Sequence, residues 1–374
     1  MAKAKRKFLP KDFDDLLKTG NIDALKAVFD NSDLNARDSA FKQTALAFND
    51  CPDDLARWLV ENGADISAPD SYGETPLHSR SGHWQGRIDV LLELGADVNH
   101  EAEGRGTPLH RAAAVGNINI VKQLLESGAN PSTVNANGLA PLAHALQQCS
   151  NSKIATISEV TQILLVATQT QTEAGPSRSI FSKIFGPRRS SVGPQPVDLK
   201  PLVTRIGEDF EFHRSNYNPV YLDETSAGLD RLYRLFDVAP VPRRIMHDGK
   251  TSIIVRSATS EDKHQELWEK LVPSSGAAAT VQGEVIRISG RIHDELYRNG
   301  GANWDRDYKK MARAFLAHIA LGEPLSGNQI SESQSIVAGV PDTDADTSRL
   351  CALAVDWVAL NPKPIPLPKP AYSR

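Results

Sequence analysis

The sequence predicts a mainly α-helical chain, an α-solenoid followed by a mostly helical second domain. The solenoid is predicted by the tetrapeptide Thr-Pro-Leu-His, which occurs at residues 75–78 and 107–110, with degraded copies at 44–46 and 140–142. About fifteen residues after each copy, a second apolar run ends in a glycine turn, and a repeat of this length is typical of stacked helical hairpins. The second domain is predicted by apolar residues at helical spacing beyond residue 202.

The residues of this repeat are those that begin and end helices. Thr75 and Thr107 can cap a helix by accepting a hydrogen bond from a backbone N–H group. The proline that follows suits the first helical position, where its missing N–H group would have no partner. A glycine such as Gly95 or Gly128 closes the second apolar run and can end a helix in the left-handed conformation. We therefore expect two helices in each repeat.

Residues 12–168 resemble the ankyrin-repeat family on these motifs, in about five units. The first unit lacks the tetrapeptide and the last has Ala140 in place of threonine, as expected of terminal repeats. The resemblance implies that His78 and His110 form hydrogen bonds to neighbouring turns and take no part in catalysis. It also implies that the concave face of the stack binds another protein.

The rest of the chain divides by composition into four segments. Residues 1–11 are expected to form a basic tail, and residues 169–202 form a linker rich in proline, glycine and serine. Residues 203–360 are expected to form a mostly helical domain. Residues 361–374 form a proline-rich tail that lies extended over it.

Three shorter patterns refine this division. An apolar stripe predicts a long helix from residue 277 to residue 298, formed by Val281, Val285, Ile288, Ile292 and Leu296. Residues 251–256 are predicted to form a strand. Apolar residues at 180–185, flanked by arginines, predict a helical turn that packs on the solenoid, although docking to a partner is an alternative.

A second resemblance covers residues 271–305, which are similar to a small helical module of uncharacterised bacterial proteins. It implies a bacterial source and no particular activity.

The overall composition argues against several classes of protein. The formal net charge of −4 lacks the basic excess of a nucleic-acid-binding protein. No apolar run reaches the roughly 18 residues that cross a bilayer, and the N-terminus does not resemble a secretory signal peptide. The three cysteines are far apart in the sequence, which indicates a reducing compartment, so we expect a cytoplasmic protein.

The sequence lacks the usual motifs of catalytic and cofactor sites. It contains no phosphate-binding loop, no nucleophile elbow and no histidine or cysteine pair at metal-ligand spacing. We therefore expect no catalytic residue, no cofactor and no metal ion.

The candidate partner-binding residues are Tyr72, Arg80, Trp84, Arg105 and Arg111. Tyr72 and Arg105 fall at turn tips, and Arg80 and Arg111 fall on the first helices of their repeats. Arg80 stands where the next repeat has a small alanine, which suggests an exposed position and little cost to the fold if it is removed. These residue types are enriched at binding hot spots. For Trp84 an alternative interpretation is that its side chain fills a gap left by the shortened repeat.

The second domain has one candidate surface, formed by Glu284, Arg287, Arg291 and Asn303. One interpretation is a solvated helix face with ion pairs between residues four apart. The other is a charged docking surface, or a polar pocket with Asn303 at its rim.

The sequence as a whole predicts a non-enzymatic protein that binds a partner protein through the concave face of its repeats. One alternative is an immunity protein or antitoxin that covers a toxin. Another is a scaffold with two protein ligands. The last is a regulated enzyme with its active site in residues 203–360, which a concave pocket near Arg287, Arg291 and Asn303 would favour.

Overall fold

A computed structural model describes residues 5–173, 198–341 and 345–372, and the turn predicted at 180–185 lies outside them. The chain divides into two compact units. Unit 1 comprises Met1–Glu208 and Pro219–Pro240, and unit 2 comprises Asp209–Asn218 and Val241–Arg374.

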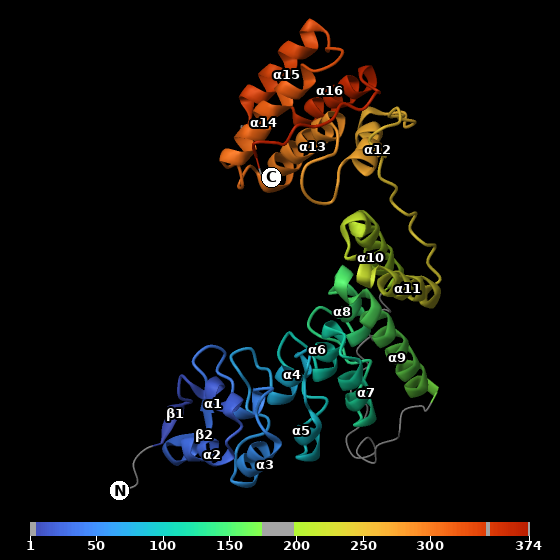
Figure 1. The fold of residues 1–374 in the computed structure, drawn as a ribbon. Coiled ribbons are helices and arrows are strands. Elements are labelled where there is room, and N and C mark those ends of the chain that lie inside the picture. The colour runs from blue at the N-terminus through green and yellow to red at the C-terminus, as the bar shows by residue number, and fades with distance from the viewer. Residues whose placement is uncertain (1–4, 174–197, 342–344, 373–374) are drawn as a thin grey trace, which may run out of the picture. The chain divides into compact units, whose positions relative to one another are not determined.

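Unit 1 is built mainly from helical hairpins that stack side by side (Figure 1). Its elements are β1 (Arg6–Phe8), α1 (Phe13–Thr19), α2 (Ile22–Asn31), β2 (Ser32–Arg37), η1 (Ala45–Ala47), α3 (Asp53–Glu61), α4 (Pro76–Ser81), α5 (Asp89–Glu93), α6 (Pro108–Val115), α7 (Ile118–Glu126), α8 (Pro141–Gln147), η2 (Asn151–Lys153), α9 (Ile154–Glu173), the first part of α10 (Lys200–His213) and α11 (Pro219–Phe236). First helices pack together, α4 on α6 and α6 on α8, while second helices pack as α3 on α5 and α7 on α9. The predicted solenoid is therefore confirmed.

The shared seam of the stack is apolar. Leu46, Leu77 and Leu109, the leucines of three successive copies of the repeat, are fully buried. Burial of each such side chain is worth about 1.5–3 kcal/mol, so the hairpins are held together by the residues that define the repeat.

The basic segment at the start of the chain is more ordered than its composition predicts. Strand β1 pairs with β2 in parallel, from Arg6 opposite Ser32 to Phe8 opposite Arg37. The side chain of Lys5 donates a hydrogen bond to the carbonyl of Phe29 (2.8 Å). This segment therefore extends the first repeat instead of forming a solvated tail.

Helix α11 belongs to the repeat unit, although we expected residues 203–360 to form the second domain. It packs along α9, which continues through the beginning of the expected linker to Glu173. A Cβ atom at Gly228 would lie 2.7 Å from the Cα atom of Ala155, so the two helices cross with almost no space between their backbones. Composition alone does not show this contact, because it joins residues that are far apart in the sequence.

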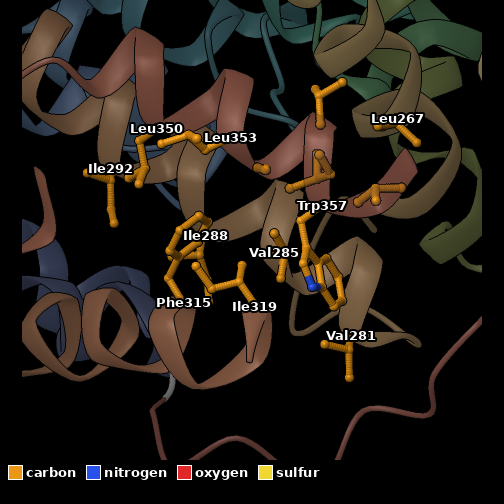
Figure 2. Packing of buried hydrophobic residues seen from close by; sticks show 14 of the residues in the cluster. Leu267, Val281, Val285, Ile288, Ile292, Phe315, Ile319, Leu350, Leu353 and Trp357 are labelled. Carbon is orange, nitrogen blue, oxygen red and sulfur yellow. The ribbon is translucent and has the colours of Figure 1, made fainter. Parts of the chain in front are cut away.

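Unit 2 packs around helix α13. Its elements are the last part of α10, η4 (Arg214–Asn216), α12 (Ser260–Leu271), α13 (Val281–Asn299), α14 (Arg306–Ile319), α15 (Gly327–Gly339) and α16 (Thr347–Leu360). Helices α12, α14 and α16 each pack on α13. The predicted apolar stripe of α13 is buried against them, and Figure 2 shows four of its residues beside Phe315 and Trp357.

The C-terminal tail lies over this unit, as its composition predicts. The backbone N–H of Val281 donates to the carbonyl of Ile365 (2.8 Å), and the Gln282 side chain donates to the carbonyls of Asn361 (2.9 Å) and Lys363 (2.7 Å). The strand expected at 251–256 is an extended segment without a sheet partner among the described residues; instead Ile253 N–H donates to the tail. None of the helices in the described ranges combines the length and the apolar character that a membrane span requires.

Candidate protein-binding surface

Two buried histidines fasten each turn to the repeat before it. His78 Nδ1 accepts from the backbone N–H of Thr75 (3.2 Å), so Nε2 carries the proton and donates to the carbonyl of Gly106 (3.1 Å). His110 repeats the arrangement and bonds the carbonyl of Leu139 (3.0 Å). Burial lowers the pKa of both imidazoles to about 4, so they are neutral at pH 7. Their role is structural, as the resemblance implied.

The turn tips are shaped by side chains that fold back on the backbone. Asp70 Oδ1 accepts hydrogen bonds from the N–H groups of Tyr72 (2.7 Å) and Glu74 (2.9 Å). Asn135 Oδ1 does the same for Asn137 (3.0 Å) in a later turn. Such bonds stabilise tight turns, and here they fix the position of the residue at the tip.

The tips of three successive turns carry a ladder of ring and guanidinium contacts. The rings of Phe41 and Tyr72 have centroids 6.4 Å apart, and the Arg105 guanidinium lies 4.2 Å from the Tyr72 centroid. A hydrogen bond from Ser71 N–H to the carbonyl of Phe41 (2.8 Å) joins the first two turns. Phe41 is 51% and Tyr72 47% exposed. We call Phe41, Tyr72, Arg105 and Arg111 the aromatic–arginine surface.

A buried carboxylate holds the two arginines of this surface together. Glu74 lies 3.7 Å from Arg105 Nη1 and 3.3 Å from Arg111 Nε, and burial raises its pKa. The Arg111 guanidinium also lies against Gly82, where a Cβ atom would be 3.1 Å from Nε. Among the described residues, neither guanidinium donates a hydrogen bond with good geometry. One carboxylate thus faces two cations, and most of their N–H donors remain available.

Arg80 is not on the surface that we expected. Its side chain is only 1% exposed; Nε donates to the carbonyl of Leu46 (2.8 Å) and Nη1 to that of Arg87 (3.2 Å). In the preceding repeat the first helix is reduced to η1, so the Leu46 carbonyl has no helical partner. Arg80 supplies that partner, and we remove it from the candidate contacts.

Trp84 is exposed rather than used to fill a gap. Its side chain is 71% exposed and stacks on the ring of His83, with centroids 6.3 Å apart. It follows α4, whereas Tyr72 precedes that helix, so the two lie at opposite ends of it. Trp84 therefore lies apart from the aromatic–arginine surface.

The four candidates in unit 2 have two different environments. Glu284 and Arg287 are buried and form an ion pair (2.7 Å), which differs from the solvated face that we considered. Further along the helix, Asp294 and Arg298 form an exposed ion pair between residues four apart (2.9 Å), as such a face predicts. Arg287 also lines a cavity, together with Arg291 and Asn303.

Phe41 is the one member of the aromatic–arginine surface that our sequence analysis missed. Its signal was present, because Phe41 lies three residues before Thr44 just as Tyr72 lies three residues before Thr75. Aligning the degraded copy with the complete one would have placed both rings at the same turn position. No cluster of three potential metal-ligating side chains occurs within the ranges that the structure describes.

Comparison with known protein families identifies the repeats. Two family models, described as ankyrin repeats in three copies and in many copies, match residues 84–165 and 44–79. Both lie within the segment that forms the stacked hairpins of unit 1.

Similar proteins share this segment. Ankyrin repeat and SOCS box protein 16 of Mus musculus is 36% identical over 97 residues, which are 24% of this chain and 21% of that protein. SH3 and multiple ankyrin repeat domains protein 2 of Homo sapiens is 32% identical over 130 residues, which are 32% of this chain and 7% of that protein. Ankyrin repeat domain-containing protein 37 of Mus musculus is 35% identical over 94 residues (23% and 55%). The matched segment covers between under a tenth and about half of the length of these relatives. The similarity is confined to the segment that contains the repeats.

Proposed function

We propose that the ankyrin repeats of this chain bind a partner protein through the aromatic–arginine surface, without chemistry on the partner. Ankyrin repeats form protein-interaction modules, and their loops and first helices provide an extended binding face. The observation that carries the proposal is the half-exposed ladder of Phe41, Tyr72 and Arg105. Aromatic and arginine side chains are the types enriched at binding hot spots.

The proposed partner presents an acidic side chain next to an apolar one. Arg105 and Arg111 share a single buried carboxylate, Glu74, so ion pairing compensates their two charges only in part. Their remaining N–H donors can form a bidentate bond to a partner carboxylate. An apolar side chain beside it would contact the rings of Phe41 and Tyr72.

The test begins with capture of partners by the full chain and their identification by mass spectrometry. Isothermal titration calorimetry then measures the affinity of the purified partner for the wild type and for two variants, Tyr72→Ala with Arg105→Ala, and Glu74→Gln with Arg111→Gln. The second variant removes the buried carboxylate together with its nearer cation, because removing Arg111 alone would leave the buried Glu74 with only the more distant Arg105 to compensate its charge. We expect each variant to bind at least about tenfold more weakly, the equivalent of about 1.4 kcal/mol.

The matched control is Arg57→Ala. Arg57 is an exposed arginine of the second-helix layer that forms an ion pair with Glu93, so its removal should change the affinity less than about twofold. If both surface variants bind as tightly as the wild type, the proposed surface is wrong.

The finer interpretations of the sequence are proposals of different strength. Covering a toxin would be one case of partner binding, and no described contact selects it. The three cysteines, which lie far apart in the sequence, support a cytoplasmic setting. The cavity near Arg287, Arg291 and Asn303 meets the geometric condition that we set for a regulated enzyme, but its chemistry supports ligand binding better, as argued next.

A further inference from the structure

Unit 2 contains a cleft that is large enough for a small molecule. Its volume is ≈ 1170 Å³, and it is lined by helices α12, α13 and α16, the loop at 272–276 and Phe212. Small-molecule sites are concave, mostly preformed, and combine apolar walls with a few polar groups. The cleft combines the aromatic rings of Phe212, Trp268 and Tyr308 with the charged side of α13.

The walls of the cleft are fixed by internal contacts. The Arg244 guanidinium donates to the carbonyls of Phe212 (3.0 Å), Trp268 (2.9 Å) and Val272 (2.6 Å), and it lies 4.4 Å from the centroid of the Phe212 ring. The Trp268 ring lies against α13 at Gly290, where a Cβ atom would be 2.6 Å from it. A ligand would therefore meet a preorganised site, which reduces the entropic cost of binding.

The floor of the cleft holds a buried donor without an acceptor. Arg287 is 2% exposed, and its Nε and Nη2 atoms donate to Glu284 (2.9 and 2.7 Å). The Tyr372 hydroxyl donates to the same carboxylate (2.6 Å). Among the residues that the structure describes, the remaining nitrogen, Arg287 Nη1, has no hydrogen-bond partner. An unsatisfied buried donor is destabilising, so an oxygen atom placed beside it gains a bond at little cost.

Arg291, about one helical turn further along α13, supplies charge to the same cleft. Within the described ranges it forms no ion pair and no hydrogen bond. The neighbouring carboxylates have other partners: Asp294 pairs with Arg298 (2.9 Å), and Glu295 accepts from the backbone N–H of Asn303 (2.6 Å). The guanidinium groups of Arg287 and Arg291 therefore offer donors to an anion on this side of the cleft, while Glu261 and Asp262 line the cleft from α12.

We propose that the cleft binds an organic carboxylate with an aromatic body. The carboxylate accepts from Arg287 Nη1 and from Arg291. The aromatic body contacts the rings of Phe212 and Trp268. This site is separate from the aromatic–arginine surface and does not depend on the function proposed for it.

Two groups beside the cleft that could act as nucleophiles, the Ser289 hydroxyl and the Cys351 thiol, are not activated. Ser289 Oγ donates to the carbonyl of Ile286 (3.0 Å) and therefore accepts from His264 Nε2 (3.0 Å) instead of losing its proton to it. Burial raises the pKa of the Cys351 thiol to about 12, so it is not a thiolate at pH 7.

The experiment is calorimetric titration of the full chain with phenylacetate and with its neutral analogue phenylacetamide. We expect phenylacetate to bind at one site and the amide to bind at least about tenfold more weakly. Arg291→Gln should weaken phenylacetate at least about tenfold, and Arg291→Lys, which keeps the charge, should restore most of the affinity. Arg313→Gln is the matched control, since it removes an exposed arginine of the same unit, on α14, that does not line the cleft.

Four results would overturn the proposal, provided that the thermal unfolding of the variants matches that of the wild type. The first is no binding of phenylacetate up to about 10 mM, which would reveal even a millimolar affinity. The second is equal affinity for the acid and the amide, and the third is equal loss of affinity in the Arg291→Gln and Arg313→Gln variants. The last is inorganic phosphate binding as tightly as phenylacetate, because the aromatic walls would then have no role.

Discussion

At the scale of single residues, burial controls the charge of three histidines. His78, His110 and His264 are enclosed by the protein, and desolvation lowers the pKa of each imidazole from 6.5 to about 4. His78 and His110 must be neutral to fasten the turns, because in each ring Nδ1 accepts a hydrogen bond and Nε2 donates one. Protonation would replace an acceptor with a donor at the helix cap.

These histidines make the stability of the chain depend on pH. Between pH 4 and pH 6.5 the unfolded state binds more protons than the folded state, so the free energy of unfolding rises with pH and levels off above about pH 7. Each buried histidine contributes a slope of about 1 kcal/mol per pH unit within this window. Urea denaturation at pH 5.0, 6.0 and 7.5 measures the free energy of unfolding at each pH and hence the slope.

The variants of this experiment separate one histidine from the others. His110→Ala should lower stability at pH 7.5 and reduce the slope by about 1 kcal/mol per pH unit. As a control for the loss of an imidazole outside the turn-fastening pair, His83→Ala removes a half-buried ring that accepts from the N–H of Gln85 (3.2 Å). An unchanged slope in His110→Ala would contradict the assigned role of burial.

At the scale of secondary-structure elements, the third repeat depends on a residue that bridges two shortened elements. Arg80 lies on α4 and bonds the Leu46 carbonyl of η1 and the Arg87 carbonyl just before α5. Gly86 is required in the same loop, since a Cβ atom there would lie 2.1 Å from the carbonyl oxygen of Arg80. These contacts replace the helical hydrogen bonds that the short elements lack.

Arg80→Ala should therefore destabilise the fold rather than weaken partner binding alone. It leaves the buried Leu46 carbonyl and the part-buried Arg87 carbonyl without donors, and a buried carbonyl without a donor costs about 1–3 kcal/mol, so we expect a loss of about 1–4 kcal/mol in the free energy of unfolding. Urea denaturation measures this loss, with the exposed Arg57→Ala as a control expected to change by less than about 1 kcal/mol. If Arg80→Ala unfolds at the wild-type urea concentration, the bridging role is wrong.

The repeat pattern predicted most of the hairpin helices of unit 1, and apolar residues at helical spacing predicted the core of α13 in unit 2. Local signals identify them: helix caps at Thr75 and Thr107, and the apolar stripe from Val281 to Leu296, which is buried as expected. The same pattern could not predict the burial of Arg80, because the acceptor that it satisfies belongs to a different, degraded repeat. A sequence pattern describes each repeat by itself, whereas this contact depends on what its neighbour lacks.

The candidate sites were predictable to different degrees. Tyr72, Arg105 and Arg111 are brought together, because equivalent positions of successive repeats lie side by side in a stack. The cleft was predicted only through Arg287, Arg291 and Asn303. Its walls depend on Arg244, which donates hydrogen bonds to the backbone carbonyls of Phe212 and Trp268. Every residue has a backbone carbonyl, so the residue types at these positions do not indicate such bonds.

At the scale of the whole molecule, two compact units carry two different kinds of candidate site. Unit 1 offers turn tips with half-exposed rings and available guanidinium donors, which suit a protein surface. Unit 2 offers a concave cleft with a buried donor, which suits a small molecule. The proposed functions can therefore be tested independently in the same full-length chain.

Amide hydrogen exchange with and without the captured partner tests the central claim most directly. If the aromatic–arginine surface binds the partner, exchange should slow in the turns at 38–43, 70–74 and 101–106 and at the start of α6, because binding excludes water and stabilises these segments. Helices α3, α5 and α7 should exchange as before. Protection confined to those second helices, or to unit 2, would contradict the account.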